Sequence, residues 1–291
     1  MPHKPVLLAE VLKVFEPVEI KVFFEGTVGA GGHARAILEA HPEIERYLAC
    51  DRDPEARRIA KENLAPWREK VEWIAGPFAD LREYLDERKA ASIDGFLIDV
   101  GVSSMQLDTR ERGFSFMGDA PLDMRMDPDA SLTAEEIVNE APEKELARIF
   151  FEYGEERRSR QVARAIVEAR RKRRIRTTQE LVAIVKPVTV WGKLHPATLV
   201  FQALRIAVND ELGQLQKGLE AAIERTSPGG RIAAISFHSL EDRIVKNVLR
   251  DAKDRLEILT KKPIGPSTEE AKENPRSRSA KLRAAEKRDE I

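Results

Sequence analysis

The first hundred residues alternate short apolar runs with segments of helical spacing, and few folds are compatible with that order. It is typical of parallel β-α-β units, in which helices cover both faces of one sheet. We expect the second helix to begin with Asp53 as its N-cap and Pro54 at its first position. The sequence therefore predicts an α/β protein with an open, doubly wound sheet. The predicted strands are 21–24, 47–50, 71–74 and 93–100, and the predicted helices are 32–40, 54–63 and 78–88.

After Ser104 the alternation stops, and the periodic segments that follow are all helical, at 133–139, 143–153, 159–170 and 178–185. Strand character returns at 231–236, after a turn rich in proline and glycine. This order indicates an all-helical insertion within one α/β domain rather than two domains in tandem. We predict a core domain of residues 1–107 and 196–291, and an inserted helical domain of residues 108–195.

Two further segments are expected to complete the core after the insertion. A helix from Pro196 to about Glu224 would lead the chain back to the sheet, because its apolar residues recur at helical spacing. The segments 256–259 and 278–285 are expected to pair as a closing hairpin.

Composition limits where the protein is expected to work. Its apolar stretches are interrupted within about ten residues, whereas a membrane-spanning helix needs roughly 20. Its first ten residues lack the apolar region of a secretory signal. Cys50 is the only cysteine, which excludes an internal disulfide and a zinc-thiolate site. We expect a soluble, cytoplasmic protein with no metal site and no contact with membranes.

The formal net charge of -1 conceals two basic stretches. Residues 157–176 hold ten basic residues and one acid, and residues 261–288 hold nine basic residues and four acids. Such stretches are typical of a nucleic-acid-binding surface, but also of a solvated helix face. Charge alone leaves both interpretations open.

A glycine-rich turn, EGTVGAGGH, follows the first predicted strand at residues 25–33. Glycines at 29, 31 and 32 allow the backbone to turn sharply and to approach a ligand closely. Residues 29–34 also satisfy the dinucleotide pattern G-x-G-x-x-G/A. A nicotinamide cofactor and S-adenosylmethionine are therefore both candidates on this evidence.

Carboxylates at three strand ends favour S-adenosylmethionine. Glu25, Asp51 and Asp99 end the first, second and fourth predicted strands, and the carboxyl ends of parallel strands meet at one edge of a sheet. Three carboxylates would repel a pyrophosphate, but they suit a sulfonium, an ammonium group and a ribose diol. Phe78, after the third strand, is placed to pack against adenine. As alternatives, Glu25 is a turn residue, Asp51 a cap and Phe78 an ordinary core aromatic.

Nine strings spread along the chain together resemble the bacterial 16S rRNA cytosine-N4 methyltransferases, also called the MraW family. The resemblance runs from the third residue almost to the last. The strings are HKPVLL (3–8), GAGGH (29–33), DVGVSSMQLD (99–108), RGFSF (112–116), DMRMD (123–127), HPAT (195–198), FQALRI (201–206), SFHSLEDR (236–243) and NPRSRSAKLR (274–283).

The resemblance implies a fold, a cofactor and a substrate. The fold is a class I methyltransferase core, Rossmann-like, with a helical domain inserted after the fourth strand. The substrate is a cytosine of 16S rRNA in the small ribosomal subunit, conventionally numbered 1402, methylated on its exocyclic N4. S-adenosylmethionine is held in that family by the residues that match Gly31, Gly32, His33, Asp51, Phe78, Asp99 and Gln106.

Neither the residues nor the resemblance assigns a catalytic residue. Asp99, Ser103 and His238 are candidates, because each lies at or shortly after the end of a predicted strand, at the expected cofactor edge. Asp99 has the alternative of contacting the cofactor only. Helix capping is the alternative for Ser103, and a structural role beside capping by Ser236 and Ser239 is the alternative for His238.

Several readings of function and partner stay open. We expect Arg170, Arg171, Lys172, Arg173 and Arg174 to contact rRNA, because they are the densest basic run of the insertion. The competing functions are methylation of a small molecule or protein, a nicotinamide oxidoreductase, and a non-catalytic RNA-binding protein. A homodimer is also left open.

Overall fold

The computed structural model describes residues 5–189 and 195–289, which fall into two compact units. The first unit combines Met1–Gly101 with Leu212–Ile291, and the second is Val102–Glu211. His3 and Lys4, which open the first of the nine family strings, lie outside the described residues.

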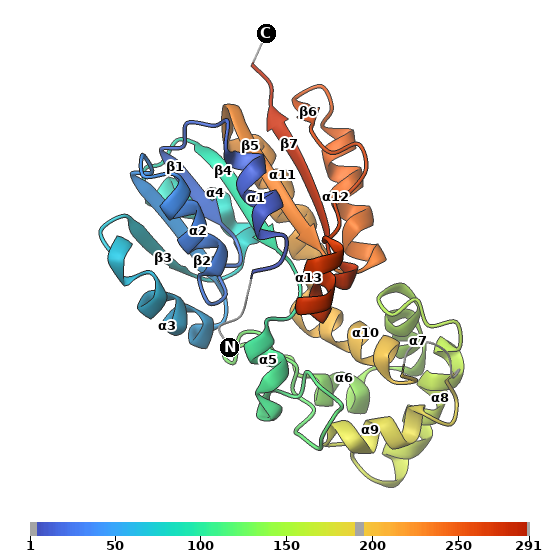
Figure 1. Cartoon of the computed structure of the whole chain (residues 1–291). Helices are drawn as coiled ribbons and strands as arrows, with labels where there is room; N and C mark the ends of the chain where they lie inside the picture. The colour runs from blue at the N-terminus through green and yellow to red at the C-terminus, as the bar shows by residue number, and fades with distance from the viewer. Residues whose placement is uncertain (1–4, 190–194, 290–291) are drawn as a thin grey trace. The chain divides into compact units, whose positions relative to one another are not determined.

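A seven-stranded sheet forms the centre of the first unit (Figure 1). Its order is β3-β2-β1-β4-β5-β7-β6. Strands β1 to β5 are parallel, whereas β7 runs antiparallel to both of its neighbours. Strand order reverses beside β1, so the prediction of a doubly wound α/β sheet is confirmed. The strands are β1 (Val22–Glu25), β2 (Arg46–Asp51), β3 (Val71–Ala75), β4 (Ile93–Asp99), β5 (Thr226–Ser236), β6 (Leu256–Ile258) and β7 (Lys281–Lys287).

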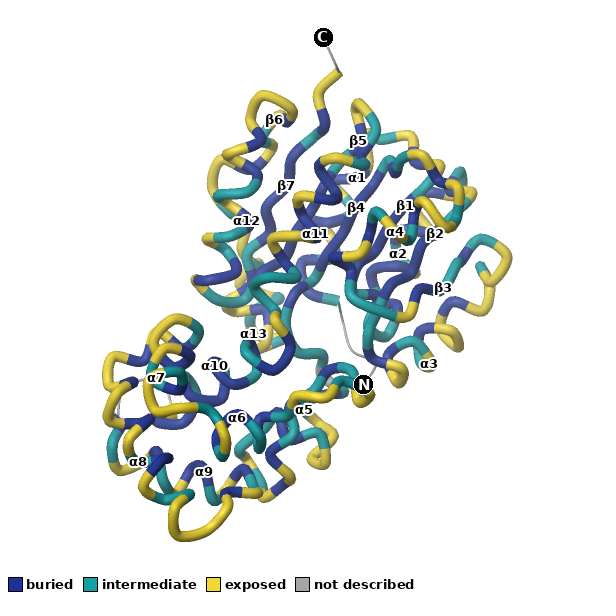
Figure 2. Tube along the Cα trace, turned by 180° about the vertical axis from the view of Figure 1, so that it is seen from behind, coloured by how far each residue is buried: buried dark blue, intermediate teal, exposed yellow. Residues whose placement is uncertain are grey.

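Helices cover both faces of this sheet, and the alternation of strand side chains explains why. Phe23 packs in a cluster with residues of α1, α2 and α3, whereas its neighbour Phe24 packs with α4, α11 and α12. The central strands are therefore buried along most of their length (Figure 2). The helices are α1 (Leu8–Phe15), α2 (Gly32–Ala40), α3 (Pro54–Asn63), α4 (Leu81–Glu87), α11 (Glu211–Arg225), α12 (Ser239–Asp251) and α13 (Thr268–Glu273).

The ends of two of these helices show how local sequence sets them. Asp53 caps α3 by accepting from the backbone N–H of Glu55 at 3.0 Å, with Pro54 at the first position, as predicted. The helix predicted at 78–88 instead begins with a 3-10 turn, Phe78–Asp80, before α4. The predicted pairing at the chain end is confirmed as the antiparallel pair β6 and β7, with α13 and the 3-10 turn Pro275–Ser279 between them.

The prediction of one helix from Pro196 to Glu224 is wrong. The chain forms two helices, α10 (Thr198–Asn209) and α11, which are separated at Asp210. Asp210 has φ +47° and ψ +40°, a left-handed conformation that ends α10 and that aspartate tolerates better than most residues.

The second unit is built from helices around one apolar cluster. Val162 and Ile166 of α8, Phe150 of α7 and Leu204 of α10 are among its buried residues. The helices are α5 (Ser104–Asp108), α6 (Ala134–Glu140), α7 (Glu143–Glu152), α8 (Ser159–Lys172), α9 (Thr178–Val185) and α10, with a 3-10 turn at Arg110–Arg112.

The borders of this unit differ from the expected insertion of residues 108–195. The unit starts six residues earlier, at Val102, and ends sixteen residues later, at Glu211. The reason is α10, which packs against α6 and α7 and buries Phe201 in the helical cluster. Periodicity showed that α10 has an apolar face but not which core that face joins.

Neither a membrane span nor a metal cluster is found in the part of the chain that the structure describes. Within residues 5–189 and 195–289, no helix combines the length and apolar character needed to cross a bilayer. The same residues contain no group of three histidine, cysteine, aspartate or glutamate side chains arranged to hold a metal ion. The thiol of Cys50 is buried in the core, which raises its pKa well above the ordinary value.

Asn209 joins α10 to the loop that carries the DMRMD string. Its Oδ1 accepts from the backbone N–H of Met126 at 2.8 Å, and its Nδ2 donates to the carbonyl of Met124 at 2.8 Å. Because these groups are buried, Asn209→Ala should lower the free energy of unfolding by about 2–4 kcal/mol. Urea unfolding followed by circular dichroism measures this. Asn247→Ala, at a half-exposed position of α12, is the matched control and should change the free energy of unfolding by less than about 0.5 kcal/mol. If the two variants lowered the free energy of unfolding equally, the stabilising role of the Asn209 hydrogen bonds would be contradicted.

Candidate functional site

The turn between β1 and α2 depends on its glycines. Gly29 and Gly31 have φ of +52° and +81°, which side chains rarely adopt. A Cβ on Gly32 would stand 2.5 Å from Cγ of Pro5, whereas one on Gly29 would meet no atom within 4 Å. Gly32 is therefore required for close packing. Gly29 presents backbone to open space, as a ligand cradle requires.

Asp51 ties the end of β2 to this turn. Its Oδ2 accepts from the backbone N–H of Gly29 and its Oδ1 from that of Asp53, both at 2.9 Å. The side chain is half-buried, and burial raises the pKa of the carboxyl above its ordinary value. Each oxygen keeps a further lone pair, so the carboxylate can also accept from ligand hydroxyls.

Asp99 ends β4 and holds a buried oxygen without a partner. Its Oδ1 has no hydrogen-bond partner among the described residues. Its Oδ2 lies 4.0 Å from Nδ1 of His33, and its backbone N–H donates to the Thr27 hydroxyl at 2.8 Å. Burial, together with the nearby Glu241 carboxylate, raises the pKa of Asp99 to about 7. Such an oxygen is costly unless a ligand donor meets it.

Glu25 is buried in the core, although the sequence indicated a carboxylate that faces the ligand. Its side chain is only 1% exposed, and Oε2 accepts from the hydroxyl of Tyr47 at 2.8 Å inside the core. Burial raises the pKa of Glu25 well above its ordinary value, and the charges of Asp99 and Asp51 raise it further. The protonated form is thereby favoured. The strand ends therefore offer a ligand two half-buried carboxylates, those of Asp51 and Asp99, rather than three.

Phe78 lies in the core rather than on an open wall. It is 6% exposed, and its side chain fills the space beside two glycines, Gly26 after β1 and Gly218 of α11. A Cβ on Gly218 would stand 2.4 Å from Cδ2 of the ring. This is the ordinary core position that the sequence left open. A contact between Phe78 and adenine stays a prediction.

His33 supports the turn with its side chain. The ring is 5% exposed, and Nε2 lies 2.9 Å from the carbonyl oxygen of Val6. It thereby connects the segment before α1 to the first turn of α2. Contact between His33 and the cofactor stays a prediction.

His238 caps α12 itself, rather than Ser236 or Ser239. Its Nδ1 accepts from the backbone N–H of Glu241 at 3.5 Å, and Nε2 lies 3.0 Å from Oε1 of Glu241. The Oε2 of Glu241 accepts in return from the backbone N–H groups of Phe237 and His238. This reciprocal arrangement gives the His238 ring a structural role.

Sequence reasoning missed Glu241. It is 1% exposed and contributes to the raised pKa of Asp99. The available signal was a glutamate three residues after a cap position, which is the pattern of a capping box. Histidine is not a common cap, so that pattern was not recognised in SFHSLEDR.

Ser103 and Gln106 belong to the second unit. Ser103 caps α5 by accepting from the backbone N–H of Gln106 at 3.2 Å, and Oε1 of Gln106 accepts from the backbone N–H of Ser103 at 3.1 Å. Capping, the alternative left open for Ser103, is therefore what the structure shows. A cofactor contact by Gln106 stays a prediction.

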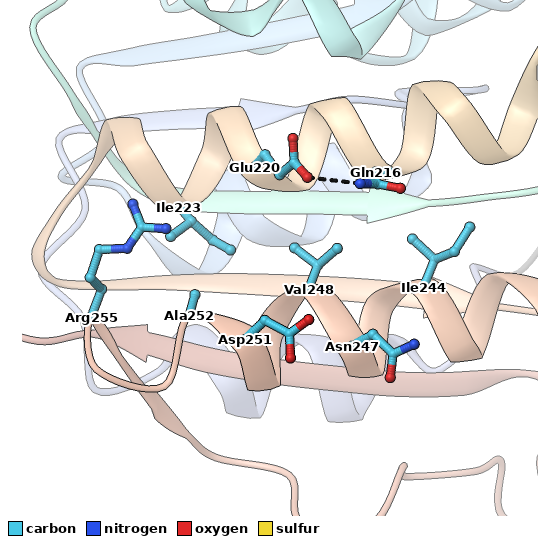
Figure 3. A pocket seen from close by; sticks show the side chains of 9 residues that line it. All are labelled: Gln216, Glu220, Ile223, Ile244, Asn247, Val248, Asp251, Ala252 and Arg255. Atoms are coloured by element: carbon cyan, nitrogen blue, oxygen red, sulfur yellow. Dashed lines mark hydrogen bonds between the residues drawn. The ribbon is translucent and has the colours of Figure 1, made fainter.

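A groove of about 360 Å³ lies between α11 and α12 (Figure 3). Its walls mix apolar side chains such as Ile223 and Val248 with polar ones, including Glu220, which accepts from Gln216 at 3.0 Å. It extends along α11 from Gln216 to Ile223 and along α12 from Ile244 to Asp251, and none of the candidate site residues lines it. The groove is therefore separate from the strand-end site.

The strand-end residues of the first unit fit S-adenosylmethionine. The open backbone at Gly29 allows close approach, and the carboxylate of Asp51 suits a ribose diol. The unpartnered Oδ1 of Asp99 suits an ammonium or amine N–H. Two carboxylates at this edge also attract a sulfonium and repel a pyrophosphate. The same residues therefore fit a nicotinamide dinucleotide less well.

Comparison with known proteins agrees with this assignment. Three curated relatives share the name ribosomal RNA small subunit methyltransferase H. That of Protochlamydia amoebophila is 50% identical over 98% of this chain and 97% of its own length, and that of Geobacter sulfurreducens is 50% identical over 98% of both. That of Trichormus variabilis is 51% identical over 99% of this chain and 93% of its own length.

Among solved structures, a proposed rRNA methylase from Clostridium thermocellum superposes with a TM-score of 0.50, at 9% identity, over 98% of this chain and 99% of that one. At that identity the likeness shows the fold alone. The sequence model of the MraW methylase family matches residues 1–288 of this chain. The chain therefore belongs to the MraW methylase family.

Proposed function

We propose that this protein transfers the methyl group of S-adenosylmethionine to the exocyclic N4 of cytosine 1402 in 16S rRNA, acting on the small ribosomal subunit in the cytoplasm. Membership of the MraW methylase family and the name shared by the curated relatives support a small-subunit rRNA substrate. The nine strings support the choice of cytosine N4. The strand-end site supports the cofactor.

Bound S-adenosylmethionine supplies an electrophilic methyl group on a sulfonium. The residues that would hold it are Gly31, Gly32, His33 and Asp51, which gather at the turn after β1 and the end of β2, together with Phe78, Asp99 and Gln106. Their task is to orient the methyl group and to keep water away. Alignment of the reacting groups can supply several kcal/mol without a dedicated base.

The cytosine amine sets the remaining chemical requirement. Its lone pair is delocalised into the ring, so an acceptor for its N–H protons helps to localise that pair in the transition state. The observation that carries the proposal is the buried, unpartnered Oδ1 of Asp99 at the end of β4. We assign this oxygen to an N–H of either the cofactor or the base. Ser103 and His238 are engaged in caps, which makes them weaker candidates.

Methyl transfer by labelled S-adenosylmethionine tests the proposal. Small subunits and naked 16S rRNA, both lacking this methyl group, are incubated with the protein, and label in RNA and in protein is counted separately. We expect label in the RNA fraction. Label confined to ribosomal proteins or to small molecules would contradict the proposal, as would tight binding of NAD without binding of S-adenosylmethionine.

A further inference from the structure

The helix α8 has one buried face and one basic face. Val162, Ala163, Ile166 and Val167 are buried in the helical cluster. The rest of the helix surface exposes four cations, Arg160, Arg164, Arg171 and Lys172. The three arginines lie along one line, and Lys172 lies about 100° further round the axis than Arg171. These four residues are called the α8 basic face below.

Most of the basic run Arg170 to Arg174 is paired with other groups of the helical unit, which the sequence alone does not show. Arg170 donates to the carbonyl of Val138 at 2.9 Å. Arg173 forms an ion pair with Glu180 of α9. Arg174 donates to Glu135 of α6 at 2.7 Å and lies 3.4 Å from Glu140. Three of the five residues expected to contact RNA are therefore occupied within the unit.

The α8 basic face has fewer carboxylate partners, with one ion pair at its edge. Within the described residues, Arg160, Arg171 and Lys172 have no carboxylate partner, and Arg164 is 70% exposed with Glu143 at 3.8 Å. Glu168 is the one acid on this side of the helix. Arg160, Arg164 and Arg171 lie within about 40° of one another around the axis, because a residue advances about 100°. They span about 16 Å along it.

Exposed cations that lie close together repel one another, and only Arg164 of these four has a carboxylate within 4 Å among the described residues. This face therefore suits a polyanion that brings several negative charges to it. We propose that the α8 basic face binds the phosphate backbone of the RNA substrate. This inference rests on the proposed function for the choice of RNA, but its geometry lies wholly within the second unit. From the sequence, all five residues from Arg170 to Arg174 are expected to contact rRNA. Only Arg171 and Lys172 of these belong to the α8 basic face, which adds Arg160 and Arg164.

The test is direct binding of a labelled 16S rRNA transcript by the full chain. Arg160→Glu/Arg164→Glu/Arg171→Glu should weaken binding at least about tenfold at 0.1 M salt, and should lower the slope of log affinity against log salt by about 2 to 3. Affinity for S-adenosylmethionine should not change. The midpoint of thermal unfolding, measured alongside, should stay at the wild-type value, because these side chains are exposed.

A matched variant, Lys13→Glu/Lys246→Glu/Lys253→Glu, makes the same change in charge at exposed sites of the first unit that lie outside both basic stretches. It should weaken RNA binding less than threefold. If both variants weaken binding equally, or the second does so more, the α8 basic face is not the binding surface. Binding of anionic vesicles but not of RNA by the wild type would also overturn the inference. Failure of the proposed function appears separately, as RNA binding by the α8 basic face without methyl transfer.

Discussion

Asp99→Asn should lower kcat/KM for S-adenosylmethionine by about 10- to 100-fold, because a hydrogen bond to a charged group contributes about 1.5–3 kcal/mol. The neutral amide keeps the shape of the side chain and one acceptor oxygen. It loses the charge that attracts a cationic or amine donor to the buried Oδ1 position. Initial rates on small subunits at varied cofactor concentration give this value.

The pH dependence of the wild type should report the same carboxyl. The pKa of Asp99 is about 7, so kcat/KM should rise with pH through about 7 as the acceptor ionises. In Asp99→Asn this rise should disappear. A wild-type profile that is flat from pH 6 to 8 would contradict a role for the ionised carboxylate.

The folding stability of the wild type should fall as pH rises through about 7, whereas its kcat/KM rises. The pKa of Asp99 is raised in the folded protein, so the stabilisation it gives is complete below the ordinary pKa of about 4 and is lost as pH rises through about 7. At pH 8, Asp99→Asn should therefore be more stable than the wild type, by roughly 4 kcal/mol. At pH 4 the two should be nearly equal. Loss of activity with increased stability distinguishes a functional role from a structural one.

Glu241→Gln is the matched control for Asp99. Its amide oxygen can still accept from the backbone N–H groups of Phe237 and His238, so the start of α12 should persist. Because the Glu241 charge raises the pKa of Asp99, its removal should move the rise in kcat/KM to lower pH. If the rise does not move, Asp99 is not the titrating group.

Asp51→Ala should weaken binding of S-adenosylmethionine by about 100-fold. The substitution removes the acceptor for the N–H of Gly29 and the carboxylate assigned to the ribose hydroxyls, and each lost interaction with a charged acceptor costs about 1.5–3 kcal/mol. Isothermal titration calorimetry measures the dissociation constant.

Asp51→Asn is the conservative comparison. It keeps one acceptor oxygen and should weaken binding by about tenfold, less than the alanine variant. Asp53→Ala, which removes the cap of α3 but no proposed ligand contact, should leave the dissociation constant within about threefold. An alanine variant of Asp51 that binds as tightly as the wild type would exclude the ribose role.

The core fold could be predicted because its signals are local. Strands β1 to β4 are short apolar runs, and Asp53-Pro54 marks the start of α3. The break at Asp210 could not, because aspartate enters the left-handed region only in a particular context. Here Arg205 and Glu211 form a two-point ion pair, with both distances 2.8 Å, around the break.

The positions of candidate site residues at strand ends could be predicted from the sequence. The directions in which their side chains point could not. Asp51 and Asp99 lie at the ends of β2 and β4 as their positions indicated, but Glu25 points to Tyr47 within the core. The spacing of residues along a chain does not show such a partner. Likewise, Arg173 and Arg174 are neutralised by glutamates of other helices, which no count of local charge reveals.

The central claim is tested most directly by locating the transferred methyl group. Small subunits lacking modification at this position are methylated by the protein, and their 16S rRNA is digested and analysed by mass spectrometry. We predict one added methyl group, on N4 of cytosine 1402. A methyl group on C5, on the 2′-hydroxyl or on another nucleotide would contradict the account, even if S-adenosylmethionine were consumed.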